Sequence, residues 1–176
     1  MASPLSDDGN RFKRGRILHA LLQTLPSLPP NARPAALAAY LAEPAHNLSA
    51  AQQSELGGEV LAVLHHPNFA PLFGPGSRAE VPLVGDVGTL KPRVISGQVD
   101  RLLVSETTVT IVDFKTNRPP PKDETGVPEV YLRQMAAYRA ALRQIYPDHE
   151  IISVLLWTDG PKLMRLSDTI LDTHTP

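Results

Sequence analysis

The hydrophobic residues repeat with a helical period over the first third of the chain and with a strand-like pattern over most of the rest. Within residues 11–25 the apolar side chains form one stripe at the spacing of an α-helix. The members of this stripe are Ile17, Leu18, Leu21, Leu22 and Leu25. Because the period changes near Ala79, the chain cannot be purely helical or purely stranded, and we expect a mixed α/β fold.

Two further helices are expected before residue 66. Pro34 suits the first turn of an Ala-rich helix that runs to about Glu43, because the N–H that proline lacks has no helical partner there. Ser49 and Gln52 have the spacing of a capping box at the start of a helix that runs to about His65. Residues 1–10 are polar and are expected to form a flexible lead-in to a single domain over residues 11–176.

Strands are expected after Ala79, where short runs rich in Val, Ile, Leu and Thr alternate with Gly and Pro. The expected strands span residues 81–87, 94–104, 109–115, 151–157 and 162–166, and a helix over 129–145 separates the third from the fourth. This order predicts a mixed central sheet flanked by helices.

Composition narrows the possible functions. The 176 residues contain no cysteine, which excludes disulfides, thiolate catalysis and Cys-ligated zinc or iron–sulfur centres. A formal net charge of −1 gives no overall basic field for nucleic acid, so any such contact must come from a local patch. No apolar run approaches the roughly 18 residues of a membrane span, and no signal peptide or Gly-rich phosphate loop is evident. We expect a cytoplasmic protein without membrane partners.

The chemistry is concentrated in a predicted hairpin. If its turn is centred on residues 106–107, Asp100 lies opposite Asp113, and Lys115 points to the same face. That face is otherwise apolar, with the pairs Leu102–Ile111 and Val104–Val109. Two directly opposed carboxylates repel each other unless a cation lies between them, and Mg²⁺ or Mn²⁺ prefers such oxygen ligands.

A second interpretation of the same acids is open at this point. Glu106-Thr107 is not a favoured two-residue turn, and a register slip of one residue would place Asp100 and Asp113 on opposite faces. Acids at strand ends are commonly solvated rim residues.

Several short blocks together resemble a known family. Asp100 followed by Asp113-Phe-Lys115 looks like the motif of the PD-(D/E)XK nucleases, although Val99 replaces the proline that usually precedes the first acid. The wider set is similar to the C-terminal nuclease domain of the AddA subunit of bacterial AddAB helicase-nucleases, a RecB-like branch. Its blocks are Arg14-Gly15-x-x-x-His19, Gly97 to Arg101, Asp113 to Asn117, Gln134-x-x-x-Tyr138 and Leu155 to Thr158.

The resemblance implies a magnesium-dependent site. Asp100, Asp113 and the carbonyl of Phe114 would hold Mg²⁺, for which Mn²⁺ would substitute, and His19 would add a ligand from the first helix. Lys115 would stabilise the charge that builds on the phosphate or orient the attacking water. From the sequence alone, a lone helical His19 is more typical of a residue at a core boundary than of a metal ligand.

The same resemblance implies residues that border DNA. Gln134 and Tyr138 lie four apart on one helical face, and Arg14 belongs to a locally basic N-terminal segment. Tyr138 could equally pack in the core, and the basic segment could be a solvated helix face. Glu80 is a possible additional acid near the metal.

Together these features predict a metal-dependent deoxyribonuclease. The resemblance implies a segment of a larger helicase chain that acts with an AddB-like subunit on double-strand breaks and receives single-stranded DNA from the motor. The alternative is a catalytically silent nuclease-like module that holds DNA or docks a subunit.

Overall fold

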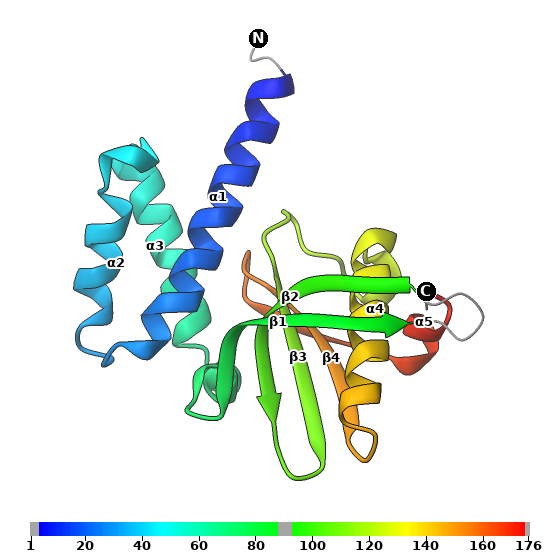
Figure 1. Ribbon diagram of the computed structural model, residues 1–176. Coiled ribbons are helices and arrows are strands. Elements are labelled where there is room, and N and C mark those ends of the chain that lie inside the picture. The colour runs from blue at the N-terminus through cyan, green and yellow to red at the C-terminus, as the bar shows by residue number, and fades with distance from the viewer. Residues whose placement is uncertain (1–3, 88–92, 175–176) are drawn as a thin grey trace.

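A computed structural model describes residues 4–87 and 93–174. A five-stranded sheet separates two helical layers, with helices α1, α2 and α3 on one side and α4 and α5 on the other (Figure 1). This architecture confirms the expected mixed α/β fold. In the part of the chain that the structure describes, no helix is long and apolar enough to cross a membrane.

The N-terminal layer contains three helices, α1 (Pro4–Thr24), α2 (Arg33–Leu41) and α3 (Ala50–Leu64). The predicted capping box is present at α3: the Ser49 hydroxyl accepts from Gln52 N, and the Gln52 side chain accepts from Ser49 N. α1 begins earlier than expected, because Pro4 starts a helix through residues 4–10 rather than a loose arm.

The strands are β1 (Ser77–Val87), β2 (Arg93–Val104), β3 (Thr108–Lys115), β4 (Glu150–Trp157) and β5 (Lys162–Leu166), in that order across the sheet. All neighbouring pairs are antiparallel except β3 and β4, which are parallel and joined through α4 (Glu129–Ile145). α4 and four of the strands match the expected positions to within one residue, whereas β1 begins at Ser77, four residues before the expected start. The short α5 (Asp168–Asp172) was not expected, although Ser167 caps its first turn and the buried Arg139 of α4 pairs with Asp168 and Asp172.

Each face of the sheet carries its own hydrophobic core. On one face, side chains of β2, β3 and β4 such as Val99, Ile111 and Leu155 pack against Met135 and Leu142 of α4. On the other face the leucine stripe of α1 packs with α2, α3 and the alternate residues of the same strands. α1 and α4 therefore lie on opposite sides of the sheet.

The β2–β3 hairpin has the predicted register. Its pairs run from Val104–Val109 to Arg101–Val112, with Glu106 and Thr107 at the turn. Neither turn residue has the positive φ that favoured hairpin turns require; instead the Ser105 hydroxyl contacts the backbone N–H groups of Thr107 and Thr108. These bonds explain why an unfavoured Glu-Thr sequence still closes the hairpin.

β2 bends where the ladder reaches Asp100. Asp100 has no ladder partner on β1 or β3, and Glu80, which stands opposite it on β1, has a φ of 51°. Val99 and Leu102 both face the α4 core, although an uninterrupted strand would direct them to opposite faces. The bend is plain in Figure 1, where β1 and β2 turn away from β3 and cross in front of α4.

Gly97 lets the bent part of β2 lie directly on α4. A Cβ at this position would come within 2.4 Å of the Tyr138 hydroxyl oxygen, which no real Cβ contact allows. We expect Gly97→Ala to destabilise the protein by about 1–3 kcal/mol, the usual cost of overpacking. Chemical denaturation measures this loss, with Gly58→Ala as a control because a Cβ there meets nothing within 4 Å. Equal unfolding free energies for the Gly97 variant and wild type would contradict the close contact.

Candidate active site

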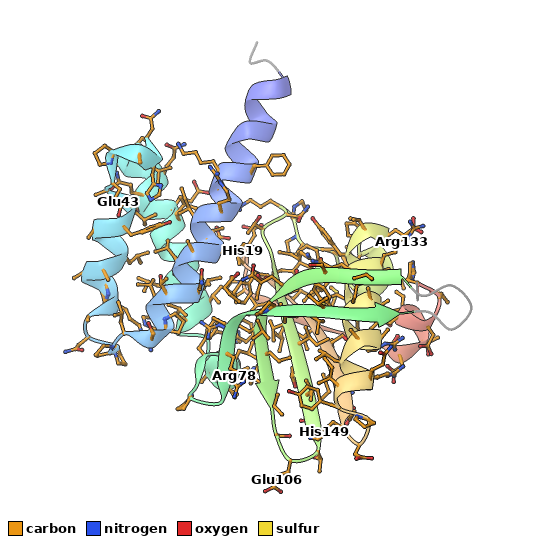
Figure 2. The ribbon with its side chains drawn as sticks, in the orientation of Figure 1. His19, Glu43, Arg78, Glu106, Arg133 and His149 are labelled. Carbon is orange, nitrogen blue, oxygen red and sulfur yellow. The ribbon has the colours of Figure 1, made fainter. Side chains whose placement is uncertain are left out.

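An open cavity of about 280 Å³ lies where β2 diverges from β3. Its wall contains both predicted acids and the lysine. The lining residues are His19, Gln98, Asp100, Asp113, Phe114, Lys115, Thr116, Asn117, Tyr131 and Gln134. Figure 2 shows His19 on α1 beside the strands, at the opposite end of the hairpin from Glu106 in the turn. α1, β2, β3 and α4 thus each contribute a side chain to one cavity.

Asp100 is held in place by contacts with β3 and with α1. Its Oδ2 atom accepts a 2.6 Å hydrogen bond from the backbone N–H of Phe114, so the carboxylate takes the place of a ladder partner. Its Oδ1 atom lies 3.2 Å from His19 Nδ1. The bend and this N–H bond fix the acid at the cavity wall, where it is 8% exposed.

Lys115 lies within a group of electron-rich partners. Its Nζ atom is 2.5 Å from Asp113 Oδ2 and donates to Gln134 Oε1 at 3.0 Å. The same atom lies 3.9 Å from the centre of the Tyr131 ring, a favourable position for a cation–π contact. These three contacts, from β3 and α4, hold a buried ammonium group beside the acids.

Gln134 is oriented by a chain of hydrogen bonds. Its Nε2 donates to the Tyr138 hydroxyl at 3.2 Å, and that hydroxyl donates to the Gln98 carbonyl at 3.2 Å. Gln134 lines the cavity, whereas Tyr138 is 7% exposed and outside the lining. The described contacts therefore give Tyr138 a packing and positioning role, and its expected contact with DNA stays a prediction.

Burial and neighbouring charges act on the pKa values of two acids, Asp113 and Glu80. Burial raises the pKa of Asp113, Lys115 opposes that rise, and the charge of Asp100 adds to it. Burial also raises the pKa of Glu80, and the charge of Asp100 raises it further. Glu80 is thus close enough for the charge of Asp100 to affect its pKa. It does not line the cavity, however, and its role at the metal stays a prediction.

Arg14 faces α3 and the segment that follows β3. Its guanidinium pairs with Glu59 and donates to the Thr116 carbonyl at 3.0 Å. Arg118 adds a second contact to Glu59 at 2.8 Å. These ion pairs fix the segment after Lys115, so the structure gives Arg14 a positioning role and leaves its expected DNA contact untested.

His19 is half-buried against Asp100, and its pKa reports that contact. Burial acts to lower the pKa, but the hydrogen bond to Asp100 and the charges of Asp100 and Asp113 outweigh it, so the pKa is raised above 6.5. The interaction contributes stability that is fully present below pH 6.5 and is lost as the pH rises through the higher folded-state pKa.

The raised pKa of His19 predicts how the stability of the metal-free protein depends on pH. We expect His19→Gln to destabilise the fold most below pH 6.5, and we expect the difference from wild type to shrink as the pH rises past the folded-state pKa. Urea unfolding in EDTA, at a series of pH values, measures it. His174→Gln is the control, since His174 has contacts only near α5. A difference from wild type that is constant over this range would contradict the charged His19–Asp100 contact.

The donor atoms in the cavity fit a hard divalent cation held through few protein ligands. Among residues 4–87 and 93–174, no three His, Asp or Glu side chains form a ready metal cluster. Asp100 and Asp113 still present two buried carboxylates on the cavity wall, and Lys115 pairs with Asp113. The Phe114 carbonyl points to the same side of β3 as its N–H, which faces Asp100. Mg²⁺ commonly binds through one or two carboxylates and keeps several waters, so the residues fit it.

Tyr131 is a site residue that the sequence reasoning missed. Its ring lies under Lys115, and its hydroxyl donates to Asn117 Oδ1 at 2.9 Å. A usable signal was present, because Tyr131, Gln134 and Tyr138 have i, i+3, i+7 spacing and so share one face of α4.

Comparison with known proteins connects this geometry to a family. The family model described as the PD-(D/E)XK nuclease superfamily matches residues 3–164. A search of curated proteins finds no match. Among solved structures, the crystal structure of SSO0001 is 17% identical, with 93% of this chain and 82% of that chain covered and a TM-score of 0.36.

Proposed function

The chain belongs to the PD-(D/E)XK nuclease superfamily, and we propose that it is an active, metal-dependent deoxyribonuclease. One observation carries the proposal: Asp100, Asp113 and Lys115 meet in a single open cavity. Burying two acids is unfavourable unless positive groups compensate them. The cavity supplies the ammonium of Lys115 beside Asp113 and, when protonated, the imidazole of His19 beside Asp100. A module that had lost catalysis would have no need for this arrangement.

The side chains supply distinct parts of phosphodiester hydrolysis. Asp100 and Asp113 would hold Mg²⁺ or Mn²⁺, with the Phe114 carbonyl and the His19 imidazole as further donors. The cation, when bound, lowers the pKa of coordinated water and offsets charge on the phosphate. Lys115 places a fixed positive charge where the pentavalent transition state gains negative charge, and Gln134 and Tyr131 keep it there.

The wider role follows from the RecB-like resemblance. We propose that the chain is the nuclease part of a bacterial helicase-nuclease of the AddAB type, which processes double-strand breaks in the cytoplasm. The helicase segment of the same polypeptide would deliver single-stranded DNA, and an AddB-like subunit would be the partner. A net charge of −1 is consistent with DNA delivered by a motor rather than captured by the domain alone.

Cleavage of labelled single-stranded DNA tests the proposal directly. We expect degradation in Mg²⁺ or Mn²⁺ and none in EDTA. Asp113→Asn is the matched inactive variant, which also identifies any contaminating nuclease. Binding of DNA without cleavage in either metal, with the helicase segment present or absent, would favour the silent DNA-holding module instead.

A further inference from the structure

α1 carries an exposed aromatic ring on the same face as His19. Phe12 is 76% exposed, and it is the one aromatic ring among the large hydrophobic side chains that the described residues leave exposed. Seven residues separate it from His19, which is two helical turns, or about 10 Å along the axis and about 20° around it. Phe12 therefore lies beyond the rim of the cavity, in line with a residue of its wall.

A cation lies between Phe12 and His19 on this face. Arg16 is four residues after Phe12 and three before His19, and it is exposed. No hydrogen bond or ion pair joins Arg16 to any residue that the structure describes, whereas Arg14 is paired with Glu59 and Lys13 is near the Asn47 carbonyl at 3.5 Å. We call Phe12, Arg16 and His19 the α1 stripe.

The α1 stripe adjoins the cavity because α1 approaches the end of β3 closely. Gly15 allows this approach, since a Cβ at that position would lie 3.3 Å from the Thr116 hydroxyl oxygen. Thr116 and His19 both line the cavity. By helix geometry, a chain that leaves the cavity past Thr116 and His19 along α1 would come to the turn of Arg16 and then to that of Phe12.

On the basis of the proposed nuclease function, we propose that the α1 stripe binds single-stranded nucleic acid beside the reacting phosphodiester. Phe12 stacks on an unpaired base, and Arg16 contacts a phosphate between that base and the cavity. A single strand offers both groups at this spacing, an anionic phosphate and an open aromatic face. In a duplex both faces of an internal base are covered by its neighbours, so a stacking ring at this place favours single-stranded substrates.

A substrate-length series tests the stripe. We compare Phe12→Ala, Phe12→Trp and Arg16→Gln with wild type on single-stranded oligonucleotides and on a dinucleotide too short to reach Phe12. Phe12→Ala should raise KM for oligonucleotides about tenfold, with kcat unchanged, because base stacking on an aromatic ring is commonly worth that much. Phe12→Trp should keep the wild-type KM, and all variants should cleave the dinucleotide like wild type. Ile145→Ala, another exposed apolar side chain on α4 about three turns from Gln134, is the control.

The outcomes separate this inference from the proposed function. An unchanged KM for oligonucleotides in Phe12→Ala would overturn the stripe while leaving the nuclease intact, as would an equal loss on the dinucleotide. If wild type cleaves nothing, the proposed function fails, and the stripe is then tested by 2-aminopurine fluorescence of a bound oligonucleotide. Quenching in wild type that is lost in Phe12→Ala supports the stripe. Equal fluorescence in both proteins would overturn the stripe. Phe12 would then stack on no base, and it would be either covered by another protein segment or exposed to solvent.

Discussion

Replacing Lys115 with alanine is expected to reduce DNA cleavage by about 10²–10³-fold, while binding of metal and single-stranded DNA changes little. The Lys115 ammonium is already fixed by Asp113, Gln134 and the Tyr131 ring. No reorganisation is therefore needed when charge develops on the phosphate, and the benefit falls mainly in the transition state. Loss of this charge should appear in kcat rather than in KM.

Lys115→Gln separates charge from shape at the same position. Glutamine retains much of the stem and a hydrogen-bond donor, so it should be nearly as impaired as alanine if positive charge is the missing element. Lys122→Ala, at an exposed lysine outside the cavity, is the matched control and should cleave like wild type. Wild-type cleavage by the Lys115 variants, at rates that still depend on Mg²⁺, would remove the role assigned to this lysine even if the protein is a nuclease.

The hairpin that carries these acids was predictable because its physics is local. Alternation along two neighbouring strands and a two-residue turn define which positions are opposed, and four observed pairs follow the expected register. Leu102, Val109 and Ile111 are buried as expected. Val104 belongs to the same face but is 42% exposed, whereas its partner Val109 is fully buried.

The bend at Asp100 was not predictable from alternation. It depends on Glu80 adopting a left-handed backbone conformation, which the sequence does not indicate because no glycine or asparagine stands there. The phase of alternation changes at the bend, so Val99 and Leu102 share a face. This bend opens the hairpin at the point where Asp100 accepts a bond from Phe114 N.

The remaining features that the sequence did not predict depend on contacts between elements that are distant in the chain. The sequence reasoning identified Arg14 as basic, but its pairing with Glu59 depends on how α1 packs on α3. Helical spacing groups Tyr131 with Gln134 and Tyr138, but its contact with Lys115 depends on how α4 covers the end of β3. α5 is too short to have a hydrophobic period of its own, and its contacts are with α4, where Arg139 pairs with Asp168 and Asp172. Local patterns thus located the reactive groups, and only packing revealed the groups that hold them.

A divalent metal is expected to stabilise the native protein, and Asp113→Ala is expected to abolish this effect. A ligand that binds only the folded state adds RT ln(1 + [L]/Kd) to the free energy of unfolding, which is about 2.7 kcal/mol at one hundred times Kd. For a chain of this length that corresponds to a rise in melting temperature of about 5–10 °C. Without metal, burial and the charge of Asp100 raise the pKa of Asp113, so ionising this acid costs stability at neutral pH. A bound cation removes that cost.

Thermal unfolding of wild type and variants in Mn²⁺ and in EDTA measures this stabilisation. Asp148→Ala serves as the control, because Asp148 lies in the turn before β4, away from the cavity lining. Its melting temperature should rise with Mn²⁺ as in wild type. The rise should also weaken in wild type as the pH falls through the pKa of His19, because a protonated imidazole cannot bind a metal. Loss of that pH dependence in His19→Gln, with part of the rise retained, would assign His19 as a ligand beside the two acids. An equal rise in wild type and Asp113→Ala would mean that Mn²⁺ binds elsewhere, and the acids would then need another partner for their charge.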